Sequence, residues 1–210
     1  MRQAINHAAR VWKVDVISMS FSFRDQVFSI KEAIENCASQ SKIIFLAAAS
    51  RNEGRNSSIT FPAAYNHLVI PIISTNSLGQ LSGFNPPPHR GCERFATLGE
   101  NVLSAWPLTP SNDSGEFVQS GTSTATSIAA GLVACILEFV RAGVETVGGT
   151  GKPSDRVWAN IHTLEGMKAI LRLIAPDEKI PYLAPSLLTD LGHDHRAIMD
   201  AIYDRALKKV

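Results

Sequence analysis

The chain has 210 residues, of which 45% are hydrophobic and 19% are charged, and its formal net charge at pH 7 is +1. This length and composition are typical of one globular domain, or of one domain with a small appendage. The near-neutral charge favours neither nucleic acid nor an anionic membrane as a partner, and no apolar run reaches the roughly 20 residues of a membrane span.

Helices and buried strands alternate along the first two thirds of the chain. Apolar residues at helical spacing predict helices over 4–12 and 27–38, and a long apolar helix follows Ser123. Continuous apolar runs predict four buried strands, at 15–21, 42–49, 68–74 and 102–106. Because proline lacks a backbone N–H, Pro71 predicts that the third strand lies at a sheet edge or carries a bulge.

This order of elements predicts an α/β fold with a parallel sheet covered by helices on both faces. Two long irregular segments, 50–67 and 75–101, interrupt the pattern, and loops of that length are usually functional. A stretch rich in Gly, Thr and Pro at 146–155 predicts a linker or a long surface loop. Two further helices are expected after it, at 164–174 and 198–206.

The three cysteines, Cys37, Cys92 and Cys135, are too widely spaced for a disulfide framework, and no CxxC pair indicates zinc. They favour a reducing, cytoplasmic compartment. His193 and His195 lie close to two aspartates, but a solvated helix start explains that cluster better than a metal site. We therefore expect no metal and no cofactor.

Four hydroxyl residues crowd the mouth of the long apolar helix, in the stretch SGTSTATSIAAG at 120–131. A serine in the first turn of a helix can attack a carbonyl while its own backbone N–H holds the oxyanion that forms. Gly121 would let the chain turn tightly and let a substrate approach the backbone. The simplest alternative is helix capping, for which Ser and Thr are preferred residues. The hydrolase motif G-x-S-x-G is not met, because Ala125 stands at its second glycine.

The same stretch resembles the nucleophile motif G-T-S-x-A-x-P-x-x-A-G of the subtilisin-like serine peptidases, the subtilases of peptidase family S8, with Ser127 in place of the proline. Three further blocks are similar to that family in the same order: VDVISMSFSF at 14–23, FLAAASRNEG at 45–54 and FPAAYNHLVIPIIST at 61–75. The resemblance covers about 1–140, and the sequence as a whole is most similar to fungal members.

The resemblance implies a subtilisin-like three-layer sandwich with a mostly parallel sheet, incomplete at its N-terminal side, plus C-terminal helices. It divides the chain into the C-terminal half of a catalytic domain at 1–143, a linker or long loop at 144–156 and a helical segment at 157–210.

By the same resemblance Ser123 is the nucleophile of a serine endopeptidase, preceded by Gly121 and Thr122 at the substrate site. Asn52 would donate its side-chain amide to the oxyanion, alongside the Ser123 N–H. The family pattern reads A-A-A-G/S-N, and here Arg51 intrudes before Asn52. Either the loop carries one extra residue, or Arg51 takes the oxyanion position.

The resemblance also assigns the substrate contacts. Ser20, Phe21 and Ser22 would line the channel and offer backbone groups to an extended peptide. Ala47, Ala48 and Ala49 would form a wall of the pocket for the residue before the scissile bond. For both stretches an ordinary buried strand end is nearly as good an interpretation. The expected partner is a protein or peptide substrate.

The aspartate and histidine that complete such a site belong to D-S/T-G and H-G-T blocks, which in this family lie upstream of every block matched here. The D-S-G at 113–115 lies just before the nucleophile, away from a strand end, so we interpret it as unrelated. His67 and His89 lie in the long loops, where a structural role is the better interpretation.

We therefore expect negligible peptidase activity from this polypeptide alone, because loss of the histidine costs about as much as loss of the whole triad. The chain would pair with a missing N-terminal half, whose presence would also allow secretion. The alternative is a binding module that keeps the peptide groove without the base.

Overall fold

The computed structural model describes residues 1–50, 59–89, 91–109, 114–146, 155–175, 177, 179, 181–187 and 195–207. Its centre is a four-stranded sheet in the order β1-β2-β3-β4, in which every neighbouring pair is parallel. The strands are β1 (Val16–Met19), β2 (Ile44–Ala48), β3 (Ile70–Thr75) and β4 (Phe95–Leu98). The parallel, apolar strands confirm the predicted sheet type.

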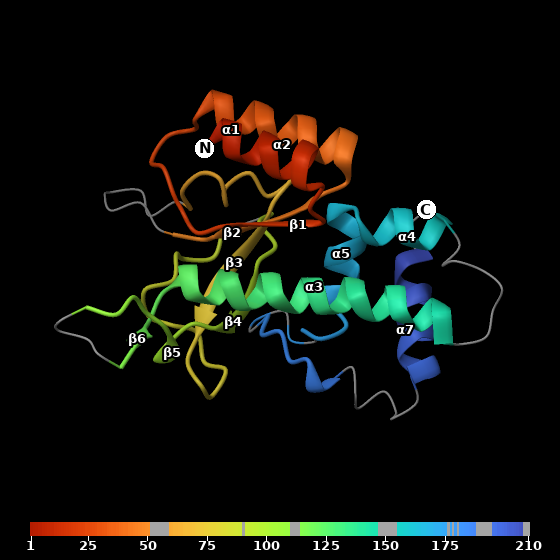
Figure 1. Cartoon of the computed structure of the whole chain (residues 1–210). Coiled ribbons are helices and arrows are strands. Elements are labelled where there is room, and N and C mark those ends of the chain that lie inside the picture. Colours follow the sequence, from red (N-terminus) through yellow and green to blue (C-terminus); the bar gives the residue numbers. More distant parts are fainter. Residues whose placement is uncertain are drawn as a thin grey trace.

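Helices cover both faces of this sheet, which gives three layers (Figure 1). Side chains alternate across a strand, so Ile44 and Leu46 of β2 enter one core cluster while Phe45 and Ala47 enter the other. The first cluster lies against α3 (Thr122–Thr146). The second lies against α1 (Arg2–His7), the π-helix η1 (Ala8–Trp12) and α2 (Phe28–Ser41).

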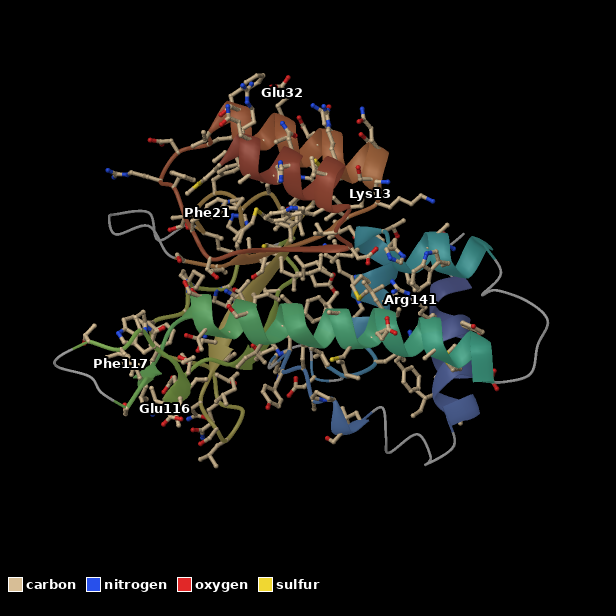
Figure 2. All side chains as sticks on the ribbon, viewed as in Figure 1. Lys13, Phe21, Glu32, Glu116, Phe117 and Arg141 are labelled. Carbon is tan, nitrogen blue, oxygen red and sulfur yellow. The ribbon has the colours of Figure 1, made fainter. Side chains whose placement is uncertain are left out.

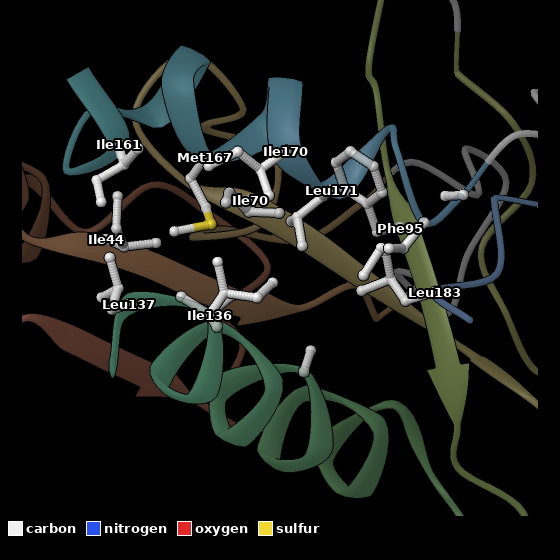
Figure 3. Packing of buried hydrophobic residues seen from close by; sticks show 14 of the residues in the cluster. Ile44, Ile70, Phe95, Ile136, Leu137, Ile161, Met167, Ile170, Leu171 and Leu183 are labelled. Atoms are coloured by element: carbon white, nitrogen blue, oxygen red, sulfur yellow. The ribbon is translucent and has the colours of Figure 1, made fainter. Parts of the chain in front are cut away.

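The C-terminal helices join the α3 side of the core. They are α4 (Asp155–Ile161), α5 (Leu164–Leu171) and α7 (His195–Leu207). Figure 3 shows Met167 and Ile170 of α5 gathered with Ile136 of α3 around Ile44 and Ile70 of the sheet. The helical segment therefore shares its apolar interior with the sheet.

Two strand predictions were wrong in placement. The predicted strand at 102–106 is β5 (Val102–Ala105), which pairs antiparallel with β6 (Glu116–Gln119) in a separate two-stranded ribbon. The fourth strand of the main sheet is β4, inside the segment predicted to be irregular. Four residues are too few for an apolar run to stand out, and β4 is stabilised by its pairing with β3.

The edge position expected of the Pro71 strand was also wrong, because β3 lies between β2 and β4 and all six of its residues are buried. Pro71 is only the second residue of β3, where the ladder begins and one missing donor is tolerated.

The two edges of the main sheet differ. The edge at β4 is covered, because Ala96 donates to Pro181 O at 2.7 Å and accepts from Leu183 N at 2.8 Å. Within the part of the chain that the structure describes, no strand pairs with the other side of β1, and Ser18 of β1 is exposed. Among the described residues, the sheet therefore has no neighbouring strand on the β1 side.

We expected no apolar run as long as a membrane span, but part of helix α3 reaches that length. Thr122–Ala142 is long and apolar enough by length and composition, with a mean hydropathy of 1.7 over its window. A core helix passes the same test, and α3 packs with Ala125, Ala129 and Val133 on the sheet.

Candidate active site

Ser123 is the second residue of α3, and its side chain is exposed. The helix begins at the carboxyl end of the sheet, where Gly121 N donates to Gly99 O just beyond β4 at 2.7 Å. Thr97 of β4 fixes the first turn of α3 to the sheet, because its buried hydroxyl donates to Ala125 O at 2.7 Å. Sheet and helix together therefore fix where the Ser123 side chain emerges.

The neighbouring hydroxyls bond along the helix, not across its open end. Thr126 Oγ1 donates to Thr122 O at 2.7 Å and Ser127 Oγ donates to Ser123 O at 3.2 Å. The hydroxyl of Ser123 makes no hydrogen bond with any of the residues described. It is thus available at a helix end whose first N–H groups have no intrahelical partner.

Two glycines shape the approach to Ser123. A Cβ on Gly99 would lie 2.5 Å from Ser74 Oγ and 2.8 Å from Gly121 O, so close packing requires a glycine there. A Cβ on Gly121 would meet only Ser123 N, at 3.8 Å. The glycine at 121 therefore leaves the Ser123 N–H uncovered, which an oxyanion site requires.

The segment after β1 lies beside the nucleophile. Ser20 Oγ donates to Ser123 O at 3.2 Å, and Ser20 and Ser22 are exposed. Farther along, the rings of Phe21 and Phe23 pack edge to face at 5.7 Å. Phe23 exchanges two main-chain hydrogen bonds with Phe61, of 2.8 and 3.1 Å. The structure thus brings the predicted channel residues at 20–22 next to Ser123.

The other predicted substrate residues lie deeper. Ala47, Ala48 and Ala49 are at most 2% exposed, at the carboxyl end of β2. Their main chain ends at the same edge of the sheet as Ser20, but the side chains form part of the interior. Their role in a substrate pocket stays a prediction.

Asn52 and Arg51 lie outside the described residues. The choice between them as the second oxyanion donor therefore stays open. Asp113 and His193 also lie outside the described residues, as does the side chain of His195.

The described histidines lie away from Ser123. His67 precedes β3, and its ring contacts Tyr65 with centroids 3.9 Å apart. His89 precedes β4, so both are at the amino end of the sheet, opposite Ser123. His7 belongs to α1 on the other face of the sheet. None of these three is placed to take a proton from Ser123.

Nothing in the sequence indicated that one buried histidine, His162, contacts a carboxylate. His162 is 6% exposed, and its Nε2 lies 3.4 Å from Asp15 Oδ1, which also pairs with Arg141. Arg141 is 18 positions beyond Ser123, about 27 Å along the helix at 1.5 Å per residue. Figure 2 shows Arg141 far along α3 from the segment that carries Phe21. This Asp–His pair therefore stabilises the far end of the domain.

Thr97 is a site-positioning residue that sequence reasoning missed. Nothing local distinguishes it from any threonine in a strand, because its partner is 28 positions away. Among the described residues there is also no group of three His, Cys, Asp or Glu side chains that would hold a metal ion.

Comparison with known proteins agrees with this geometry. A family model described as the subtilase family matches residues 1–150. The major intracellular serine protease of Bacillus subtilis (strain 168) is 31% identical over 186 residues, which are 83% of this chain and 54% of that protein. The minor extracellular protease Epr of the same strain is 30% identical over 125 residues, 59% of this chain and 18% of Epr.

The chain thus spans about half the length of the first of these relatives, at 54%. Both relatives are bacterial, and a fungal origin of this chain stays a prediction.

Solved structures share the fold. The prenylagaramide maturation protease PagA superposes with a TM-score of 0.65 at 16% identity, over 96% of this chain and 66% of PagA. The S218A mutant of the PatA protease domain gives a TM-score of 0.63 at 17% identity, over 96% of this chain and 64% of the other. At these identities the likeness concerns the fold, whereas the family rests on the sequence match over 1–150: the chain belongs to the subtilase family of serine proteases.

Proposed function

We propose that this chain carries the nucleophile and half of the oxyanion hole of a serine endopeptidase. The observation that carries the proposal is the position of Ser123, exposed in the first turn of α3 with the 20–22 segment hydrogen-bonded beside it. A peptide laid along that segment brings a carbonyl carbon to Ser123 Oγ. The attack forms a bond from Ser123 Oγ to that carbon and gives a tetrahedral oxyanion. Its collapse breaks the amide bond, leaves an ester on Ser123 and releases the other half of the peptide as an amine, which takes up the proton that a general base removed from the hydroxyl.

The oxyanion is stabilised by the backbone N–H of Ser123 at the positive end of α3. Asn52 supplies the second donor, with Arg51 as the alternative. Such a side-chain donor is worth about a hundred- to a thousand-fold in rate, a magnitude that the subtilisin asparagine itself exemplifies.

The general base comes from polypeptide outside this chain. Among the described residues, no histidine lies near Ser123 to accept the proton of its hydroxyl. A histidine oriented by an aspartate would supply this, and the pair would come from the N-terminal half of the catalytic domain.

Two adjoining surfaces favour such a half. Within the described part of the chain no strand pairs with the outer edge of β1, and strands readily pair with such an edge. The outer face of α3 exposes Ile128, Gly131 and Cys135, which lie three and four positions apart on one stripe. Ile128 is 38% exposed, and an apolar stripe of this kind is typical of a covered helix face. A strand and a helix of the N-terminal half would cover both.

The test compares two polypeptides with a serine-reactive phosphonate probe. The present chain alone is expected to label negligibly at Ser123. The longer polypeptide that includes in-frame D-S-G and H-G-T blocks is expected to label readily, and the Ser123→Ala variant of it is the control. Efficient labelling of the present chain alone would contradict the need for an external base.

A second outcome distinguishes the binding module. If the upstream coding sequence lacks both blocks and the chain still binds an extended peptide without cleaving it, the peptide groove has been retained without catalysis.

In the longer polypeptide, Ile128→Glu should impair assembly, while Lys31→Gln on the opposite layer should not.

A further inference from the structure

A cavity lies at the opposite end of the sheet from Ser123. It encloses about 910 Å³ between the loop that precedes β4 and the chain that follows α5. Pro88 and Cys92 line it from the loop, and Ala175 and Pro181 line a second wall from the chain after α5. Charged side chains also line it: Glu93, Arg94, Arg172, Asp177 and Lys179. This volume is in the range of cavities that hold small organic ligands.

Main-chain hydrogen bonds hold the second wall in place. Ala96 N donates to Pro181 O at 2.7 Å, and Ala184 N donates to Ile174 O at 2.8 Å. These bonds tie the described part of the second wall to β4 and to Ile174, just after α5. A wall held in place in this way loses less entropy on binding a ligand.

Arg94 is a half-buried cation on the cavity wall. Its Nη1 donates to Pro86 O at 2.7 Å and to Pro87 O at 3.2 Å. Within the described part of the chain, Arg94 forms no ion pair with a carboxylate. Burial lowers the pKa of this guanidinium, as expected for a cation that has lost water without gaining a counter-ion.

One acid of the cavity lining, Glu93, is already paired with cations. Glu93 accepts from both Nε and Nη2 of Arg172, the latter at 2.6 Å, and lies 3.9 Å from the buried Lys168 Nζ. Glu93 therefore does not compensate the charge of Arg94, and Asp177, which also lines the cavity, forms no ion pair with Arg94 within the described part of the chain. The remaining N–H groups of a guanidinium form a planar fork that suits a carboxylate.

We propose that this cavity binds a small organic carboxylate, with Arg94 holding the carboxylate and Pro88, Ala175 and Pro181 contacting an apolar body. The site is separate from Ser123 and does not depend on the proposed peptidase function. Its occupant is recognised by charge and shape together, so an uncharged ligand of the same shape should bind far less well.

Cys92 provides a built-in reporter, because its thiol lies on the cavity wall. The test measures alkylation of the purified chain by iodoacetamide at each cysteine, by mass spectrometry. The probe is N-acetyl-L-phenylalanine, and its uncharged amide is the matched control. At ten times the dissociation constant, the acid should slow Cys92 about tenfold. Cys135, exposed on α3, should react unchanged.

The variant Arg94→Gln keeps a donor for the proline carbonyls and removes the charge. It should weaken binding of the acid roughly 10- to 100-fold, as expected for charged hydrogen bonds. Lys31→Gln on α2 should have no effect. Equal protection by the acid and the amide, or no protection by either, would overturn the proposal. Because this comparison uses the unmodified chain, it decides the matter even if Arg94→Gln fails to fold.

Discussion

Ser20 Oγ donates a hydrogen bond to the main-chain carbonyl of Ser123 at 3.2 Å, although 103 positions separate the two residues. Ser20 follows β1 and Ser123 opens α3, so the bond joins the carboxyl end of the sheet to the first turn of the helix. It holds the predicted peptide channel beside the predicted nucleophile.

Two glycine-to-alanine substitutions should shift stability in opposite directions. Gly99→Ala places a Cβ 2.5 Å from Ser74 Oγ and 2.9 Å from Ala125 Cβ, so it should lower the free energy of unfolding by about 1–3 kcal/mol. Gly131→Ala meets nothing within 4 Å and should raise it by up to about 1 kcal/mol, because alanine favours a helix. Urea unfolding measures both, and a Gly99→Ala variant as stable as the original chain would contradict the packing.

The Thr97 hydroxyl should contribute measurably to stability. Thr97→Val removes the buried donor to Ala125 O and should lower the free energy of unfolding by about 1 kcal/mol. Thr97→Ser keeps the donor and loses only a methyl group, so it separates the hydrogen bond from packing. Equal urea midpoints for Thr97→Val and the unmodified chain would show that the bond adds nothing.

Replacing Gly121 should slow the reaction of Ser123 much more than it changes the stability of the fold. In the longer polypeptide that carries the base, Gly121→Ala covers the Ser123 N–H and should slow phosphonate labelling by about 100-fold or more. Its Cβ would make an ordinary contact at 3.8 Å, so the unfolding midpoint should stay nearly unchanged. Ser127→Ala, one turn farther along α3, is the matched control. A Gly121→Ala variant that labels normally would argue against an oxyanion bound at Ser123 N.

Tyr65 should titrate far above an ordinary tyrosine. Burial, and then the hydrogen bond to Glu35 and its negative charge, raise the pKa of Tyr65 to about 12 from 10.0. The folded chain thus keeps a proton that the unfolded chain releases. The stability that this group contributes is fully present below pH 10 and is lost as the pH rises toward 12.

Tyrosinate absorbance measures this titration. Burial also raises the pKa of Tyr203, so the assignment depends on variants and not on curve shape. Tyr65→Phe should remove the step near pH 12, and Glu35→Gln should move it to lower pH. A step that persists in Tyr65→Phe would assign it to another tyrosine.

Local patterns predicted most helices and three of the four strands of the main sheet. The apolar spacing at 27–38 and the buried run at 42–49 became α2 and β2 nearly as expected. The fourth strand, β4, was missed because its four residues are stabilised by pairing with β3 and not by a local pattern. The run at 102–106 was correctly predicted as extended, but no local pattern indicated its antiparallel partner, β6.

The candidate site divides in the same way. Residues close together in the chain, from Gly121 to Gly131, carry the nucleophile motif, so the sequence by itself determined Ser123, its helix and its family. Only the tertiary structure decided that Ser20 contacts Ser123, that Thr97 supports the helix from below and that β1 is left open. Those relations join residues far apart in sequence, and their free energy appears only when the sheet and α3 pack together.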